Sequence, residues 1–232
     1  MEVYNRERDK ELPYEIEHIY PDYSLYPKYT KDTAYGFLTR GCPRGCNFCH
    51  VASKEGRASI KVADLDEFWN GQKNIVLTDP NILACKDRVD LLQQLKSSRA
   101  RIDFNQGLDI RLVNREVLEI LKDIKVKAIH FALDKYEDFE LFKKKAEIVK
   151  EITGWNRSSI TVYILVNFDT TLEQDLERIE LCRKLNWQPF PMIYDKEHAD
   201  SIYKQLQRWC NPFIFWKVEK FEEYKTCQVN TQ

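Results

Sequence analysis

Hydrophobic positions along the chain follow two alternating patterns: short runs of β-branched and aromatic residues, and longer stretches with apolar residues every three or four positions. The first pattern is typical of buried strands and the second of amphipathic helices. Ile160–Val166 is the clearest predicted strand, and Phe139–Thr153, followed by Gly154, is a predicted helix with a C-terminal stop. The predicted strands cover 35–39, 74–78, 102–105, 127–133, 160–166 and 188–193, and the predicted helices 62–69, 88–97, 115–122, 139–153, 172–185 and 198–209.

Strands that alternate regularly with helices predict an α/β fold, in which helices cover a parallel sheet. Periodicity alone does not choose between an open doubly wound sheet and a partial barrel of the triosephosphate-isomerase kind. In both folds the active face lies at the carboxyl ends of the strands, and here the residues after the strands are polar. They are Thr78-Asp79-Pro80-Asn81, Asn105-Gln106-Gly107-Leu108-Asp109, Asp134, Asn167 and Tyr194-Asp195.

The strand–helix units predict one domain over residues 35–210, preceded by a tyrosine-rich, charged extension (1–34) and followed by a C-terminal tail (211–232). The net charge of -1 gives no bulk electrostatic reason to expect a nucleic acid or membrane partner. The polar start MEVYNRERDKELPYE does not resemble a secretory signal, and no apolar run reaches the roughly 18 residues of a membrane span. We therefore expect a cytoplasmic protein without membrane partners.

The chain has seven cysteines, and in a reducing compartment such residues are more often metal ligands or catalytic groups than a disulfide framework. Cys42, Cys46 and Cys49 cluster in the stretch RGCPRGCNFCH, residues 40–50. The remaining four are scattered, and we expect them to be small buried apolar residues. These are Cys85, Cys182, Cys210 and Cys227.

Three kinds of metal site compete for the cysteine cluster. The string Cys-Asn-Phe-Cys-His matches the attachment signal of a c-type haem, but the chain shows no export signal and the motif follows a strand. Structural zinc usually takes four ligands in two separate pairs, whereas this set is a compact group of three, with His50 adjacent to Cys49. Iron–sulfur ligation fits best, because three thiolates leave one iron of a four-iron cluster free for a non-protein ligand.

The spacing Cys42-x-x-x-Cys46-x-Phe48-Cys49, directly after a predicted strand, resembles the signature of the radical S-adenosylmethionine superfamily. The wider stretch resembles the branch whose members often carry a cobalamin domain. The similarity covers about residues 20–195, and its matching pieces are Pro21-Asp22-Tyr23, 35–49, Lys54-Glu55-Gly56 and the segment LTDPNIL at 77–83. The resemblance implies a partial (β/α)6 barrel, a 4Fe-4S cluster on Cys42, Cys46 and Cys49, and S-adenosylmethionine as cofactor.

The same resemblance implies a reaction. S-adenosylmethionine bound to the open iron is cleaved by one electron, from a donor such as flavodoxin or ferredoxin, and the resulting 5′-deoxyadenosyl radical abstracts hydrogen from a substrate. The sequence names neither a catalytic acid or base nor the substrate, which is a small molecule, a nucleotide or a macromolecule. The Asp-x-His-x-x-Gly pattern of a cobalamin domain is absent, which disfavours methyl transfer through cobalamin.

Further cofactor contacts follow from the resemblance by position. Phe48 is expected near the adenine, and Asp79 and Asn81 are expected to hold the amino group of the cofactor. Two departures from the family pattern stand out: the second-strand motif lacks its usual glycines and glutamate, and the fifth-strand motif lacks glycines. The expected contacts to ribose, carboxylate and adenine platform are Gln106, Asp109 and Arg111 after the third strand and Asn167 after the fifth.

A rival interpretation is a non-catalytic iron–sulfur or zinc module that binds a partner such as nucleic acid. It would use the basic side chains around the cysteines, namely Arg40, Arg44, Lys54 and Arg57.

Overall fold

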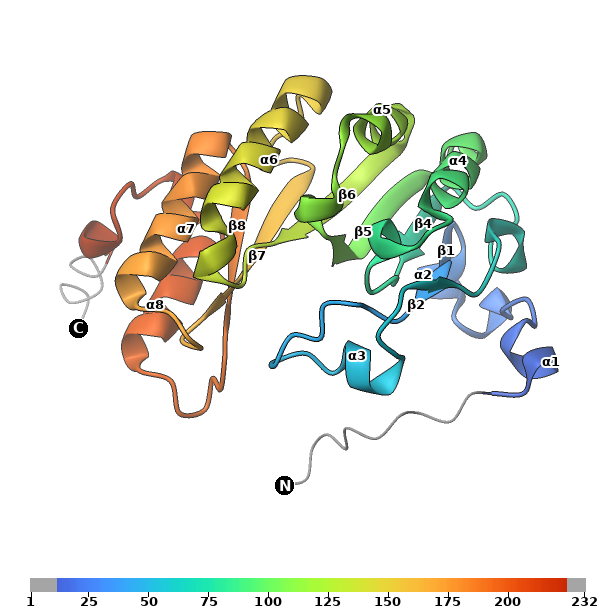
Figure 1. The fold of residues 1–232 in the computed structure, drawn as a ribbon, viewed down its shortest axis with the longest axis horizontal. Helices are drawn as coiled ribbons and strands as arrows, with labels where there is room; N and C mark the ends of the chain where they lie inside the picture. Colours follow the sequence, from blue (N-terminus) through green and yellow to red (C-terminus); the bar gives the residue numbers. More distant parts are fainter. Residues whose placement is uncertain (1–11, 225–232) are drawn as a thin grey trace. The chain divides into compact units, whose positions relative to one another are not determined.

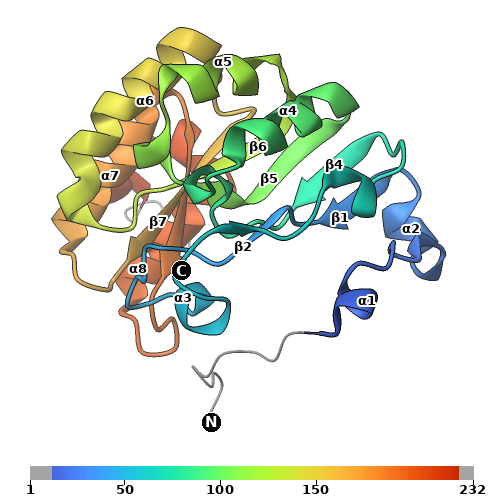
Figure 2. The ribbon, with the colours of Figure 1, turned by 45° about the vertical axis from the view of Figure 1, so that its right-hand side comes forward.

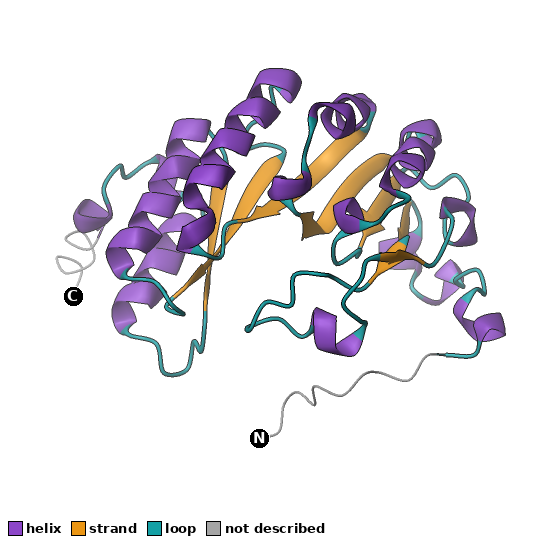
Figure 3. Ribbon diagram, in the orientation of Figure 1, coloured by secondary structure: helices purple, strands orange, loops and turns teal. Residues whose placement is uncertain are grey.

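The computed structural model describes residues 12–224. It contains a six-stranded parallel sheet in the order β1-β4-β5-β6-β7-β8, with helices between successive strands (Figures 1 and 3). The strands are Thr33–Gly36 (β1), Asn74–Leu77 (β4), Arg101–Leu108 (β5), Lys125–Ala132 (β6), Ile160–Val166 (β7) and Gln188–Ile193 (β8). Strand order follows chain order, and the sheet is open, as in a partial barrel.

The main helices each follow a sheet strand and begin within a residue or two of their predicted start, except the last. They are Arg88–Ser98 (α4), Arg115–Asp123 (α5), Phe139–Thr153 (α6), Leu172–Leu185 (α7) and Ser201–Cys210 (α8). Gly154 has φ 66° and ends α6, as predicted. Within residues 12–224 no helix combines the length and the apolar composition needed to cross a bilayer.

By its packing the chain divides within β6 into two units, residues 1–129 and 130–232. In the first unit β1, β4 and β5 pair in parallel, with Leu77 opposite Gly36 on one side and Phe104 on the other. Ile75 of β4 and Leu91 and Leu95 of α4 are at most 1% exposed and belong to the buried core of this unit.

Short elements complete this first unit. Thr39–Arg40 (β2) pairs antiparallel with Ile60–Lys61 (β3), and Val51–Lys54 forms α3. The N-terminal segment contains Tyr14–Glu17 (α1) and Pro27–Thr30 (α2), and α2 contacts β1. The hydroxyl of Tyr23 accepts the N–H of Tyr35 in β1 at 3.0 Å and lies 3.1 Å from the carbonyl oxygen of the same residue.

In the second unit β7 and β8 pair in parallel, with Tyr163 opposite Phe190. Trp187 is 0% exposed and packs its ring against those of Phe131 and Phe142, at centroid distances of 5.6 and 6.3 Å. The C-terminal segment also packs, because Phe221 and Tyr224 are buried. Up to residue 224 the tail is therefore less solvated than its polar sequence suggests.

Four predicted elements differ clearly from the structure. The predicted helix 62–69 is only the 3₁₀ turn Leu65–Glu67, although Asp64 does precede it as N-cap and donates its N–H to Glu67 at 2.8 Å. The predicted strand 102–105 continues to Leu108, and the predicted helix 198–209 begins at Ser201, after a turn in which His198 bonds Asp195 at 2.9 Å.

The predicted strand 35–39 is divided into β1 and β2. The cause is a side chain far along the sequence: the carboxylate of Asp79 accepts the N–H groups of Leu38 and Thr39 at 3.0 and 2.6 Å. These two N–H groups are therefore not available to a neighbouring strand, and the chain turns into the cysteine segment.

Candidate cofactor site

The three clustered cysteines lie on a loop, residues 41–50, between β2 and α3 (Figure 2). The pairing of β2 with β3 brings together the two ends of the segment 41–59, which contains this loop and α3. Inside it the Cys42 N–H donates to the Gly56 carbonyl at 3.1 Å, and the Cys49 N–H donates to the Cys46 carbonyl at 3.0 Å. The loop is thus closed by backbone hydrogen bonds of its own, which leaves the thiols to other partners.

Gly41 is the tightest point of this loop. Its φ of +81° lies in the left-handed region, and a Cβ at this position would stand 2.2 Å from the carbonyl oxygen of Ala58. Its N–H donates to the Glu55 carboxylate at 3.1 Å. Only glycine satisfies both the conformation and the contact, so this residue fixes how the chain enters the cysteine loop.

The cysteines fall into two classes. Cys42 and Cys46 are half-buried and Cys49 is exposed, and none of them is in a disulfide. Cys85, Cys182 and Cys210 are each 0% exposed, as predicted, and burial raises the thiol pKa of Cys182 and Cys210 far above the usual range. Cys227 lies outside the described residues. Access to ligands is therefore confined to the clustered thiols among the cysteines that the structure describes.

The three loop cysteines do not form a site for a single metal ion. Across residues 12–224, no group of three His, Cys, Asp or Glu side chains is arranged so that it could hold a single metal ion. The assignment of Cys42, Cys46 and Cys49 as ligands stays a prediction.

Asn81 is the predicted site residue that the fold brings to a cysteine. It is 3% exposed, and its Nδ2 donates to the Cys42 sulfur at 3.6 Å. Its Oδ1 is buried without a hydrogen-bond partner among the described residues. Such an orphaned acceptor is costly in a folded protein, and it marks a position where a ligand donor fits.

Asp79 lies two residues earlier and is 5% exposed. Besides the two N–H groups already described, it accepts the Thr39 hydroxyl at 2.7 Å. Burial raises its pKa to about 6, although these hydrogen bonds counteract the effect. The carboxylate is directed to the segment that leads into the cysteine loop, and its predicted contact with the cofactor amino group stays untested.

Asp109 and Arg111, both predicted to contact the cofactor, pair with each other. The guanidinium of Arg111 donates two bonds to the Asp109 carboxylate, at 2.9 and 2.8 Å, and Arg44 of the cysteine loop lies 3.8 Å from it. Burial alone would raise the pKa of Asp109, but the hydrogen bonds of Arg111 and the charges of Arg111 and Arg44 outweigh it and keep the pKa below its usual range. An ionised Asp109 thus ties the cysteine loop to the end of β5.

Two further predicted contacts lie on β5 and on the cysteine loop. Gln106 is exposed within β5, because that strand runs further than predicted, and Phe48 is half-buried on the cysteine loop. Their expected contacts to the cofactor stay predictions.

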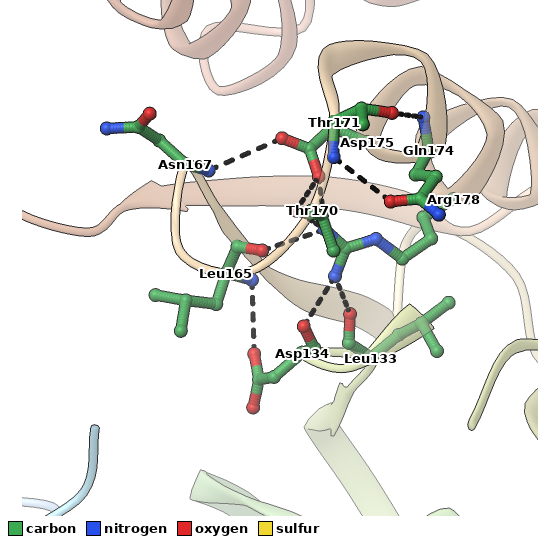
Figure 4. Close-up of polar contacts among 9 residues, drawn as sticks. All are labelled: Leu133, Asp134, Leu165, Asn167, Thr170, Thr171, Gln174, Asp175 and Arg178. Atoms are coloured by element: carbon green, nitrogen blue, oxygen red, sulfur yellow. Dashed lines mark hydrogen bonds and ion pairs between the residues drawn. The ribbon is translucent and has the colours of Figure 1, made fainter. Parts of the chain in front are cut away.

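Asn167, after β7, explains one departure from the family pattern. Its φ of 60° is left-handed, the conformation for which glycine is usual and asparagine the common substitute. Its N–H donates to Asp175 at 3.4 Å, and Asp175 is ion-paired with Arg178 (Figure 4). Neither residue of this pair was predicted from the sequence, although both fall on the same stripe of α7 as buried Ile179 and Cys182.

The basic side chains of the rival interpretation are partly engaged within the protein. Arg40 lies 3.7 Å from the Glu55 carboxylate and over the ring of Phe37, and Arg44 faces Asp109. These contacts disfavour a basic surface presented to nucleic acid.

No family model matches the chain, and no curated protein sequence matches it. Two solved structures are similar at 14% sequence identity. SuiB of Streptococcus suis bound to S-adenosylmethionine has a TM-score of 0.52 over 86% of this chain and 48% of that one. SuiB bound to precursor peptide SuiA has a TM-score of 0.53 over 96% and 53%. The chain therefore spans about half the length of these structures.

The fold prediction is confirmed. The six-stranded parallel sheet with intervening helices is the α/β arrangement expected of a partial barrel, and it is shared with a protein crystallised with S-adenosylmethionine. At 14% sequence identity this likeness concerns the fold.

Proposed function

We propose that the chain is a radical S-adenosylmethionine enzyme whose three loop cysteines hold a 4Fe-4S cluster. The observation that carries this proposal is the hydrogen bonding of the buried Asn81 side chain. Its Nδ2 donates to the Cys42 sulfur, and its Oδ1 has no hydrogen-bond partner among the described residues. A cofactor bound beside Cys42 through its amino group would supply the missing donor.

The chemistry of the thiols supports a cluster more than a single ion. Cys42, Cys46 and Cys49 are accessible and belong to one loop, and thiolates are the ligands that iron–sulfur clusters take. Each cysteine of such a site binds a different iron, so the sulfurs surround a body larger than one ion and need not converge.

When bound, the cluster and S-adenosylmethionine supply the electron transfer and the 5′-deoxyadenosyl radical that takes a hydrogen atom from the substrate. The protein positions them and excludes water. Asn81 donates a hydrogen bond to the Cys42 sulfur, and its Oδ1 would accept one from the cofactor ammonium. Asp79 fixes the entry to the cysteine loop, and the Arg44–Asp109–Arg111 group holds that loop against β5.

A direct experiment separates this proposal from a non-catalytic module. The chain is reconstituted anaerobically with iron and sulfide, and iron, sulfide and visible absorbance are measured per chain. Dithionite and S-adenosylmethionine are then added, and release of 5′-deoxyadenosine is followed by chromatography. We expect about four irons per chain and release of the nucleoside. A full cluster with no release would overturn the enzyme assignment and favour the non-catalytic module.

The substrate follows from a second set of assays. In these, flavodoxin or ferredoxin with its reductase replaces dithionite as electron donor. A peptide is the first class to test, because SuiB was crystallised with a precursor peptide. Small molecules and nucleotides form the other arms, and the true class is the one that accelerates 5′-deoxyadenosine release.

A further inference from the structure

Ser59 is a buried residue at the end of the segment that contains the cysteine loop, and the function proposed above gives it no role. It is 8% exposed and immediately precedes β3. Its hydroxyl donates to the backbone carbonyl of Asn81 at 2.9 Å. The residue with the unpartnered Oδ1 is therefore bound by this segment through its backbone as well as through its side chain.

Asn81 is held by both ends of the segment 41–59. At the start of the segment the Cys42 sulfur accepts a hydrogen bond from the Asn81 Nδ2 at 3.6 Å, and at the end Ser59 binds the Asn81 carbonyl. The two ends are themselves joined, because the Cys42 N–H donates to the Gly56 carbonyl at 3.1 Å and β2 pairs with β3. Ser59 thus fixes the backbone of Asn81 relative to the cysteine that its side chain contacts.

The need to satisfy the Asn81 carbonyl does not by itself account for the Ser59 hydrogen bond. That carbonyl already accepts the Ala84 N–H at 3.1 Å, in the 3₁₀ turn Ile82–Ala84. The side chain of Asn81 makes no capping hydrogen bond to this turn, so the turn does not hold the amide group. The Ser59 hydroxyl adds a second restraint on the Asn81 backbone, and the direction of the amide depends on that backbone.

A buried polar network of the second unit shows how a purely backbone role differs. Arg178 is 0% exposed. It donates to three backbone carbonyl oxygens at the ends of β6 and β7, at 2.7, 2.7 and 2.9 Å, namely those of Leu133, Asp134 and Leu165 (Figure 4). Among the described residues no acceptor of this network is buried without a partner. Ser59 instead holds a residue whose buried Oδ1 still lacks a donor.

We propose that Ser59 is a positioning residue that sets the affinity for S-adenosylmethionine by orienting Asn81. This inference rests on the proposed function, in which the Asn81 Oδ1 would accept a hydrogen bond from the cofactor ammonium. Ser59, Asn81 and the cysteine loop all belong to the first unit of the chain. Because Ser59 acts on Asn81 and not on the thiols, its loss should weaken cofactor binding and leave the cluster in place.

The test compares two deletions of a buried hydroxyl in the same unit. Ser59→Ala removes the hydrogen bond to Asn81. The matched control is Thr30→Val, because Thr30 is also 8% exposed and its hydroxyl also donates to backbone carbonyl oxygens, those of Tyr23 and Tyr26 at 2.6 and 2.7 Å. Both variants lose a hydroxyl that is bonded to the backbone, but only Ser59→Ala loses it at Asn81.

The measurement is equilibrium binding of S-adenosylmethionine to the anaerobically reconstituted full chain, with the cluster oxidised so that no cleavage takes place. Isothermal titration gives Kd, and iron per chain is measured on the same sample. We expect Ser59→Ala to raise Kd roughly 3- to 10-fold, the effect of one hydrogen bond, with iron per chain unchanged. Thr30→Val is expected to keep Kd within about twofold. A thermal melt establishes that both variants are folded.

A double variant distinguishes positioning from a general loss of structure. Asn81→Ala removes the side chain that is to be positioned. Adding Ser59→Ala to Asn81→Ala should change Kd by no more than about twofold, whereas an effect of Ser59 on the cysteine loop or on overall stability would give the full loss again.

The outcomes separate the two proposals. If the unaltered chain binds S-adenosylmethionine and Ser59→Ala keeps its Kd, the positioning inference is overturned alone. The same holds if Thr30→Val raises Kd as much as Ser59→Ala, if the double variant shows an additive loss, or if Ser59→Ala loses iron in proportion to binding. If the unaltered chain with a full cluster neither binds S-adenosylmethionine nor releases 5′-deoxyadenosine, the proposed function is overturned and this inference falls with it.

Discussion

The cysteine loop and the strand ends held by Arg178 are both polar, but they are built in opposite ways. In the loop the thiols are accessible, the backbone is closed on itself, and a buried amide oxygen of Asn81 has no described partner. Around Arg178 the charges are completely buried and compensate each other. In the first region polar atoms could bind a ligand, whereas in the second the polar groups bind the backbone.

Substitution of the loop cysteines should have the largest effect, and it tests whether the loop supplies the iron ligands. Cys42→Ala, Cys46→Ala and Cys49→Ala should each lose nearly all iron after anaerobic reconstitution, because each removes one of three thiolates. Cys182→Ala is the control, since that thiol is fully buried and its change should cost only about 1–2 kcal/mol of unfolding free energy. Equal iron loss in Cys182→Ala would contradict the ligand assignment.

The next effect concerns the shape of the loop. Gly41→Ala adds a Cβ 2.2 Å from the Ala58 carbonyl, whereas Gly154→Ala has the same left-handed strain with nothing within 4 Å. We expect the strain to cost about 1 kcal/mol in both variants, and the clash to add roughly 1–3 kcal/mol in Gly41→Ala. Urea unfolding measures the cost, and iron per chain should fall only in Gly41→Ala. Similar behaviour of the two variants would mean that the loop tolerates a side chain.

Asn81→Ala tests whether this residue contacts S-adenosylmethionine without being needed to hold the iron. Iron per chain should persist because the thiols remain, while the KM for S-adenosylmethionine should rise roughly tenfold with the loss of a buried hydrogen bond. Asn211→Ala is the matched control, because its Oδ1 is likewise buried without a partner among the described residues but follows α8. An unchanged KM in Asn81→Ala would remove the main support for the proposed cofactor position.

The smallest effect is a pH dependence at Asp79. The pKa of Asp79 is raised from 3.8 to about 6, so the folded protein takes up its proton at higher pH than the unfolded chain. Protonation of Asp79 therefore favours folding: this contribution is complete below about pH 3.8 and is lost as the pH rises through 6. Relative to Asp79→Asn, the unaltered protein should gain roughly 1–3 kcal/mol of unfolding free energy between pH 7.5 and pH 4.5. Urea unfolding at both pH values checks this, and a constant difference between the two proteins would refute it.

Much of the fold was predictable from the sequence because buried strands and amphipathic helices leave a direct mark on hydrophobic periodicity. The position of β7 and the end of α6 at Gly154 are examples. The break between β1 and β2 was not predictable from the sequence. Its cause is the carboxylate of Asp79, about forty residues later, which accepts the N–H groups of Leu38 and Thr39. Periodicity describes local segments and contains no information on such distant partners.

The candidate site was predictable to a similar degree. Motif spacing singles out Cys42, Cys46 and Cys49, and the position after β4 singles out Asn81, whose contact with Cys42 the fold then provides. Arg178 and Asp175 were missed because a charge on a helix is normally solvated, and only the tertiary structure reveals that both are buried. The left-handed Asn167 was likewise treated as a departure from the glycine pattern, although asparagine serves the same conformation.

The phenol of Tyr23 covers part of the exposed edge of β1. Edge strands expose N–H and C=O groups that invite pairing with another chain. Here the Tyr23 hydroxyl bonds Tyr35 of β1 and lies 2.7 Å from the Phe68 carbonyl, so one side chain acts as a substitute for a neighbouring strand. Loss of the Tyr23 side chain would remove this cover and leave the edge of β1 open to pairing with another chain.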